Sequence, residues 1–261
     1  MPDMASFKDN VIPLHGKVSD AEWETRQNLA AAFRTAHHFG WNDTVRNHIT
    51  AQLPGAEDEF LMNPLGLGWH EITASSLVRT NFAGDILSGG DAKLAPAGFN
   101  FHSEILKCKP EIVCVLHVHE ISGTAVSATE EGLITFDQGG CMLHGEVGYH
   151  DFEGLANEAE EAPRIVSDLG DKHALIMRNH GLVTVGRTIG EAFTYMHSLI
   201  TACRTQVQLL SMGVPIRRLA EEICVQTHEQ MMGPGGNRTI GERDWPMYFR
   251  IAEGLDPSFK D

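Results

Sequence analysis

Residues 113–122 of this 261-residue chain read VCVLHVHEIS, an apolar run with two histidines, His117 and His119, at alternate positions. In a β-strand alternate side chains point to the same face, so the two imidazoles can converge on one point. A buried strand normally carries aliphatic side chains. The pair therefore indicates either a metal site or two histidines whose hydrogen bonds are satisfied within the core. A third ligand is needed to favour the metal.

A candidate third ligand, His180, stands in the segment ALIMRNHGLVTVG (174–186). Its two apolar runs flank a turn of Asn179, His180 and Gly181, a pattern that predicts a β-hairpin. Gly181 permits close backbone approach, which leaves the imidazole free to point at the end of the sheet. Three neutral imidazoles with one or two open coordination positions suit Zn²⁺ foremost, and also Mn²⁺, Fe²⁺, Co²⁺ or Ni²⁺ as Lewis acids.

Charge and composition argue against several classes of protein. The chain has 20 Lys+Arg against 35 Asp+Glu, a formal net charge of -15 at pH 7, which repels phosphate backbones and anionic lipid surfaces. We therefore expect no nucleic-acid partner and no membrane partner. No apolar run reaches about 18 residues, and MPDMASFKDN lacks the pattern of a secretory leader, so we expect a cytoplasmic location. The five cysteines form no CxxC pair and are expected to be reduced.

The spacing of apolar residues predicts a mixture of helices and short strands. A helix is expected to begin at the capping sequence SDAE (19–22), with Ser19 as the cap, and to end near His38 before Gly40. The runs HITAQL and EFLMN, joined by PGAED, predict a β-hairpin over 48–63. Further helices are expected at 72–80, 99–107, 122–128, 154–170, 188–212 and 245–253, and further strands at 112–119, 145–154 and 174–186.

These strands and helices follow one another without a regular βαβ rhythm, which favours a mainly antiparallel sheet flanked by helices. The length suits one main domain. We expect an N-terminal arm over 1–18, the domain itself over 19–232, and a tail over 233–261. The tail begins with a hinge at GPGG (233–236), and its helix is a candidate to close the site.

Across about residues 22–215 the chain resembles the class II aldolase/adducin superfamily, and several motifs resemble the adducin head more than the aldolases. The resemblance implies an α/β fold, a three-layer αβα sandwich with a mainly antiparallel, mixed central sheet. It also implies a homotetramer or larger assembly, and a metal held by His117, His119 and His180. The motifs are NHIT (47–50), NPLGLGWHEITASSLV (63–78), AGFNFHSEI (97–105), HVHEISGTAVSA (117–128), GEVGYHDFEG (145–154) and RNHGLVTVG (178–186).

The sequence departs from the aldolases of this family at their acid/base and phosphate-binding positions. The aldolases carry SSE where this chain has Pro96, Ala97 and Gly98. A tyrosine that donates a proton in the aldolases falls near Gln138, and Leu65 replaces a small hydroxyl residue. A phosphate group needs several backbone or hydroxyl donors. We therefore do not expect a phosphorylated sugar as substrate.

Other residues near these motifs are candidates for catalysis and substrate binding. Tyr149 and His150 are candidate proton carriers in place of the missing glutamate. Glu120 is either catalytic or a structural partner of the ligands, since a side chain after His119 in the strand points away from the metal. The candidate substrate-binding residues, each also consistent with ordinary turn hydrogen bonding or packing, are Asn47, His48, Thr50, Gly98 and Gln138.

Two functions from different classes fit these observations. The first is a divalent-metal-dependent carbon-carbon lyase, a decarboxylase or retro-aldolase, acting on a small non-phosphorylated hydroxy, keto or aromatic acid. The second is a non-catalytic, adducin-like oligomeric binding or scaffold protein. A metal with an open coordination position favours the lyase. A protein that takes up no metal favours the scaffold.

Overall fold

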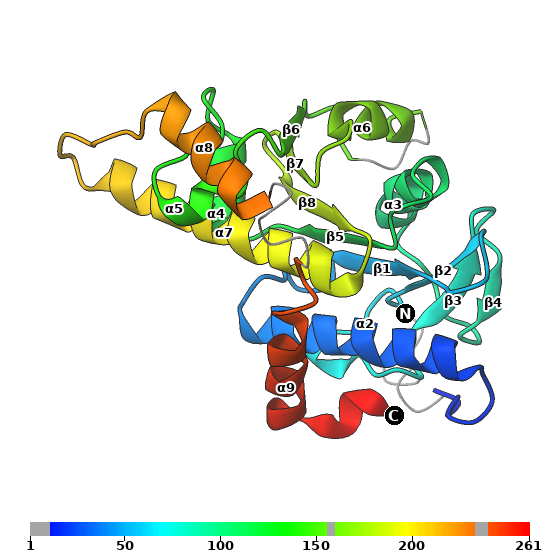
Figure 1. Cartoon of the computed structure of the whole chain (residues 1–261). Coiled ribbons are helices and arrows are strands. Elements are labelled where there is room, and N and C mark those ends of the chain that lie inside the picture. Colours follow the sequence, from blue (N-terminus) through cyan, green and yellow to red (C-terminus); the bar gives the residue numbers. More distant parts are fainter. Residues whose placement is uncertain (1–10, 156–159, 233–239) are drawn as a thin grey trace.

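The computed structural model describes residues 11–155, 160–232 and 240–261. Within them the chain forms an eight-stranded sheet in the order β4-β3-β2-β1-β5-β8-β7-β6 (Figure 1). Neighbouring strands are antiparallel except β6 and β7, which are parallel. The strands are β1 (His48–Gln52), β2 (Glu59–Met62), β3 (Val78–Asn81), β4 (Ile86–Ser88), β5 (Cys114–Val118), β6 (Val147–His150), β7 (Ala174–Met177) and β8 (Gly181–Gly186).

Helices cover both faces of this sheet, with α3 and α6 on one side and α2, α7 and α9 on the other (Figure 1). The fold is therefore a three-layer αβα sandwich with a mixed, mainly antiparallel sheet, which confirms the expected fold class. The helices are α2 (Asp20–His38), α3 (Pro96–Cys108), α4 (Ile121–Ser127), α5 (Gln138–Cys141), α6 (Ala162–Leu169), α7 (Ile189–Ser211), α8 (Glu221–Met232) and α9 (Trp245–Leu255), with the 3-10 turns η1 (Trp69–Glu71) and η2 (Pro257–Lys260).

The central strand β5 is buried on both faces, which explains its unbroken apolar sequence. Leu116 and Val118 join the core under α2 and α7, whereas Val115 joins the core under α3 and α6. His117 follows the alternation of Val115, and its ring meets the edge of Phe101 from α3 at a centroid distance of 5.4 Å. The imidazole of His117 thus lies between the sheet and α3.

The first helix confirms the predicted boundaries and half of the predicted cap. The Oγ of Ser19 accepts a hydrogen bond from the backbone N–H of Glu22 at 3.2 Å. Gly40 adopts the left-handed φ of 71° that ends such a helix. The Glu22 carboxylate instead accepts from Arg26 and Arg79, at 2.8 Å each. Because these ion pairs occupy the Glu22 carboxylate, it does not accept from the N–H of Ser19 to complete the capping box.

The helix expected over 72–80 is wrong. Val78–Asn81 forms β3, which pairs antiparallel with β2. The residues before it make a tight turn, in which the N–H of Thr73 donates to the Oγ of Ser76 at 2.8 Å. Ser and Thr side chains offer the backbone such local partners in place of helical bonds, and the β-branched residues that follow favour a strand.

The predicted hairpins over 48–63 and 174–186 and the histidine strand are confirmed. Four helices, α3, α4, α7 and α9, also fall close to their predicted ranges. The sequence analysis missed α5, α8 and β4. The GPGG hinge, residues 1–10 of the arm and residues 156–159 of the helix predicted over 154–170 lie outside the described residues. The division of the chain at residues 18 and 232 stays a prediction.

None of the helices in the described part of the chain combines the length and apolar character that a bilayer crossing requires.

A buried arginine connects α2 to the edge of the sheet formed by β3 and β4. Arg26 has no exposed surface and pairs with Glu22. Its guanidinium also donates to the carbonyl oxygens of Ala74 and Leu77, at 3.1 and 2.8 Å, and to the Oγ of Ser88 at 3.1 Å. Each of the three guanidinium nitrogens therefore has an acceptor, which offsets the cost of burying the charge.

Replacing Arg26 with leucine should leave these acceptors without a donor. We expect R26L to lower the free energy of unfolding by about 3 kcal/mol, measured by urea denaturation. R218L is the matched control, because Arg218 is 56% exposed and pairs only at the surface with Glu131, and it should change stability by about 0.5 kcal/mol or less. Equal effects of the two variants would contradict the structural role of Arg26.

Candidate metal centre

Three histidines meet where the end of β5 lies beside the start of β8. The antiparallel register pairs Val118 with Leu182, so His119 and the turn residue His180 fall at the same edge of the sheet. The ring centroids of His117, His119 and His180 lie 4.7 to 4.9 Å apart. One nitrogen of each ring lies within 4.8 Å of the other two, and no other such group of three or more His, Cys, Asp or Glu residues exists in the described part of the chain.

The turn that carries His180 is shaped by its neighbours. Asn179 takes a left-handed φ of 55°, which asparagine tolerates better than most residues. A Cβ at Gly181 would lie 2.5 Å from the carbonyl oxygen of Val118 and 2.9 Å from the His119 ring. Glycine is therefore required for β8 to approach the end of β5 this closely.

A hydrogen bond of His117 and a charged contact of His119 indicate which nitrogen of each ring carries the proton. The Nδ1 of His117 lies 3.0 Å from the carbonyl oxygen of Leu182, which can only accept, so this nitrogen is the donor. The Nδ1 of His119 faces a carboxylate oxygen of Asp43 at 3.5 Å. With the proton of each ring on Nδ1, each lone pair lies on Nε2, and the two Nε2 atoms are 2.9 Å apart. Facing lone pairs repel unless a cation lies between them, so this donor set fits a divalent metal.

Burial keeps the three imidazoles uncharged. It is the largest cause that lowers the pKa of His180 to about 4, followed by the charges of His119 and His150. The pKa of His117 lies well below its usual value for the same first reason. Burial also lowers the pKa of His119, and Asp43 opposes this shift. Neutral imidazole is the form that binds metal, so no proton has to be displaced at pH 7.

Two further imidazoles, His48 and His102, line the same end of the sheet. His48 in β1 pairs with His117 across the ladder, and their rings stack at 6.1 Å with an interplanar angle of 16°. Burial, ahead of the charges of His119 and His180, lowers the pKa of His48 to about 3. The Nδ1 of His48 and the Nε2 of His102 are buried without a partner among the described residues. Both rings are therefore uncharged and lie beside the three clustered histidines.

The ring of His48 fills the space in which a side chain at position 98 would lie. A Cβ built on Gly98 would stand 2.5 to 2.6 Å from three atoms of that ring. This approach is closer than real carbon atoms make, and one of the two would have to move. An imidazole from β1 therefore takes the place that the resemblance gives to an acidic side chain from α3.

The predicted substrate-binding residues before and within β1 are mostly turned to internal partners. Asn47 is fully buried, and its carbonyl accepts from Trp69 Nε1 at 3.3 Å. The Thr50 hydroxyl lies 2.9 Å from His102 Nδ1 and is also fully buried. Gln138 is exposed at the start of α5, a helix that packs against α7 and α8. The remaining two candidates, His48 and Gly98, contact each other as described above.

The candidate proton carriers Tyr149 and His150 also have partners. The Tyr149 hydroxyl accepts from the N–H of Leu133 at 2.9 Å, and the Arg178 guanidinium covers its ring at 4.3 Å. The nitrogens of His150 face two carboxylates, Nδ1 that of Asp168 at 2.7 Å and Nε2 that of Glu161 at 3.3 Å. These contacts fix both side chains in place.

Glu120, the third catalytic candidate, caps α4. One carboxylate oxygen accepts from the N–H groups of Ser122 and Gly123, at 2.8 and 3.0 Å. The other accepts from Arg204 Nε at 2.9 Å. Both oxygens thus hold α4 and α7 beside the histidine strand, which is the structural alternative that the sequence left open.

The sequence analysis assigned no role to Asp43, although the structure places it against His119. The two residues are far apart in the chain, and no local pattern links an aspartate before β1 to a histidine after β5. His102 belongs to the motif AGFNFHSEI, but its contact with Thr50 could be known only from the register of helix and sheet.

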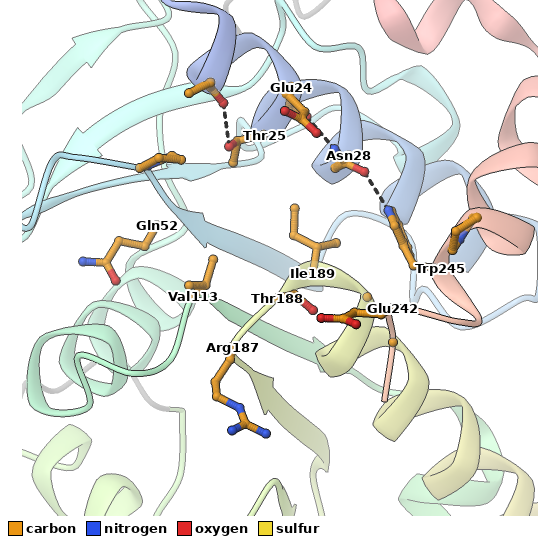
Figure 2. A pocket seen from close by; sticks show the side chains of 15 residues that line it. Glu24, Thr25, Asn28, Gln52, Val113, Arg187, Thr188, Ile189, Glu242 and Trp245 are labelled. Carbon is orange, nitrogen blue, oxygen red and sulfur yellow. Dashed lines mark hydrogen bonds between the residues drawn. The ribbon is translucent and has the colours of Figure 1, made fainter. Parts of the chain in front are cut away.

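A cavity of about 460 Å³ lies near Val113, at the opposite end of β5 from His117 (Figure 2). It is bounded by α2, the start of α7 and the first turn of α9. Trp245 Nε1 donates to Asn28 Oδ1 at 2.6 Å, as Figure 2 shows, and Arg187 pairs with Glu191, which lies outside the lining. Among the described residues that line this cavity, no side-chain donor or acceptor is buried without a partner.

The fold and the histidine cluster define a class of protein, and comparison with known proteins gives its family. Residues 27–207 match the family described as Class II Aldolase and Adducin N-terminal domain, and the chain belongs to this family.

The chain is similar both to proteins named as aldolases and to adducins. The chain is 40% identical over 256 residues to the "Putative aldolase class 2 protein" of Caulobacter vibrioides, covering 97% of this chain and 99% of that one. It is 44% identical over 189 residues to alpha-adducin of Rattus norvegicus, covering 71% of this chain but 26% of the adducin. The solved L-fuculose 1-phosphate aldolase from Glaciozyma antarctica PI12 superimposes with a TM-score of 0.81 at 27% identity, over 99% of this chain and 100% of that one.

The close approach of Gly98 to His48 gives a prediction. We expect G98A to lower the free energy of unfolding by about 1–3 kcal/mol, because the new methyl group would overlap the His48 ring. In an H48A background the same change should cost much less, since the ring is gone. A double-mutant cycle of urea denaturation curves measures this coupling.

G254A in α9 is the matched control for a helical glycine, because nothing lies within 4 Å of the position of its Cβ. It should raise stability by roughly 0.5–1 kcal/mol through helix propensity alone. An equal cost of G98A with and without the His48 ring would show that the overlap does not control this position.

Proposed function

We propose that this protein is a divalent-metal-dependent carbon-carbon lyase, a decarboxylase or retro-aldolase, that acts on a small non-phosphorylated hydroxy, keto or aromatic acid. The observation that carries the proposal is the pair of Nε2 atoms of His117 and His119, 2.9 Å apart, with a nitrogen of His180 beside them. When bound, a divalent metal supplies Lewis acidity that stabilises negative charge on a substrate oxygen. Zinc is the metal we place first.

The ligand set also supports an acidic substrate. His117, His119 and His180 are neutral, so their side chains leave the charge of a divalent cation uncompensated. Such a centre favours an anionic group such as a carboxylate in its open positions. In the proposed function the three imidazoles would hold the cation, with His117 buried and His119 and His180 partly exposed.

The first turn of α3 supports a substrate without phosphate. Its cap is Ala95, which makes no side-chain hydrogen bond, and Pro96, Ala97 and Gly98 bring no hydroxyl or cation. A phosphate group would find fewer donors there than it requires.

We propose that water carries the protons of the reaction, because the side chains expected to carry them are held by other groups. The Tyr149 side chain is fixed by the Leu133 N–H and the Arg178 guanidinium, and both nitrogens of His150 face carboxylates. We propose that these two residues and Glu120 support the walls of the site.

A second candidate function is an adducin-like binding or scaffold protein. The identity of 44% to rat alpha-adducin over 189 residues favours it. Either function fits a homotetramer or larger assembly in the cytoplasm, which we propose as the working state of the chain. The two functions differ in whether metal and cleavage go together.

Metal content is the first test of the proposal. We expect about one divalent metal per chain by elemental mass spectrometry. We expect loss of that metal in the double variant H117A/H119A, because each of its two substitutions removes an Nε2 ligand. H37A/H70A is the control, since these two rings form another pair, 5.0 Å apart, outside the proposed centre. Folded wild-type protein that stays free of metal after addition of Zn²⁺, Mn²⁺ or Fe²⁺ would refute the lyase proposal.

Activity is the second test. Hydroxy, keto and aromatic acids should be screened for release of carbon dioxide or an aldehyde, with the same substrates tested after chelation. We expect chelation to lower the rate by roughly 100-fold or more and added metal to restore it, because charge stabilisation of this kind is worth that much. Metal-loaded protein that cleaves none of these acids would favour the scaffold function.

A further inference from the structure

The two strand histidines of the proposed centre are oriented by different means. His117 lies within β5, and its Nδ1 is fixed by the carbonyl of Leu182 on the neighbouring strand. His119 lies one residue beyond the end of β5 and has no ladder partner. Its imidazole is 19% exposed, and its Nδ1 faces the Asp43 carboxylate at 3.5 Å. The sheet therefore orients the ring of His117, whereas the ring of His119 has to be oriented by a side chain from a different loop.

The loop that carries Asp43 is fixed independently of the histidines. The N–H of Asp43 donates to Asn47 Oδ1 at 2.5 Å, and the N–H of Arg46 donates to the Asp43 carbonyl at 3.0 Å. Trp69 Nε1 in turn donates to the carbonyl of Asn47, which anchors the loop to the core. The backbone that carries the Asp43 carboxylate is therefore held in place by contacts that involve no metal.

This loop contains two costly features. Thr44, a β-branched residue, takes a left-handed φ of 51°. The Nδ2 of Asn47 is buried without a hydrogen-bond partner among the described residues. Each feature costs free energy and persists only where the surrounding structure enforces it, often at functional sites. What the loop presents to the centre is the carboxylate beside His119.

We infer that Asp43 is a positioning residue for the metal centre, which holds the Nδ1–H of His119 so that the Nε2 lone pair points at the cation. The inference rests on the proposed metal-dependent function. A carboxylate that accepts from the outer nitrogen of a ligating histidine fixes the tautomer and the ring orientation and makes the inner nitrogen a stronger ligand. Asp43 thus links the loop between α2 and β1 to the affinity of the centre.

Arg46 shares the same carboxylate and provides the matched control. Its Nη1 lies 3.1 Å from Asp43 Oδ2, and its side chain is 70% exposed. Removing this guanidinium leaves the carboxylate facing His119, whereas D43N keeps the size of the side chain and its backbone donor to Asn47 but removes the charge. The pair of variants separates the carboxylate from the packing of the loop.

The experiment measures the Zn²⁺ dissociation constant of each protein by competition with a chromophoric chelator, and the visible absorption of the Co²⁺-loaded form. We expect D43N to bind Zn²⁺ about 10- to 100-fold more weakly and to shift the Co²⁺ bands, with R46A within about threefold of wild type. D43E, which retains a carboxylate, should fall between wild type and D43N. Thermal unfolding of the metal-free proteins shows whether each variant is folded.

The outcomes separate this inference from the proposed function. Wild-type protein that binds neither Zn²⁺ nor Co²⁺ would refute the metal centre itself. Wild-type protein that binds both, with D43N unchanged in affinity and spectrum, would overturn only the role of Asp43. Equal weakening by D43N and R46A, or a D43E protein that binds no better than D43N, would also overturn it, because the loop and not the carboxylate would then be responsible.

Discussion

The antiparallel pairing of β5 with β8 is the constraint on which the rest of the site depends. It sets Val118 opposite Leu182, and so brings the residues after one strand beside the turn before the other. Helices cover both strands on both faces, so a slip of one residue would turn His117 into the opposite core. The position of the proposed ligands therefore depends first on this buried ladder, which fixes His117 and brings the turn of His180 beside the end of β5, whereas His119 lies beyond the ladder and faces Asp43 from a loop.

Burial at this end of the sheet also sets the charge of the site. The chain carries a net charge of -15, yet the imidazoles of His48, His117 and His180 are kept neutral chiefly by desolvation. Glu120, the residue after His119, is engaged by α4 and Arg204. Asp43 faces one of the proposed ligands, at a distance that leaves it outside the ligand group. An acidic protein thus contains a centre whose ligands contribute no charge.

The sequence predicted the parts of this structure that depend on local periodicity. The hairpin around His180, the strand of His117 and the helix after Ser19 each have a repeating apolar pattern and a marked turn or cap. The helix expected over 72–80 failed because Thr73 and Ser76 close a turn by side-chain bonds, which apolar spacing does not reveal. Asp43 and the contact of His48 with Gly98 were beyond sequence reasoning, because each joins elements whose relative position is fixed only by the folded sheet.

The contact between β1 and α3 restricts how a site of this kind can change. Because the His48 ring occupies the space beside Gly98, an imidazole at 48 and a side chain at 98 overlap in this arrangement. An acidic residue introduced at 98 would meet the imidazole, and loss of the imidazole alone would leave a cavity without a new functional group. Conversion of this site, with a histidine from the strand, into one with a carboxylate from the helix therefore involves two coupled substitutions, because each single substitution leaves either an overlap or a cavity. The two arrangements are separated by a barrier in sequence, even though their folds are the same.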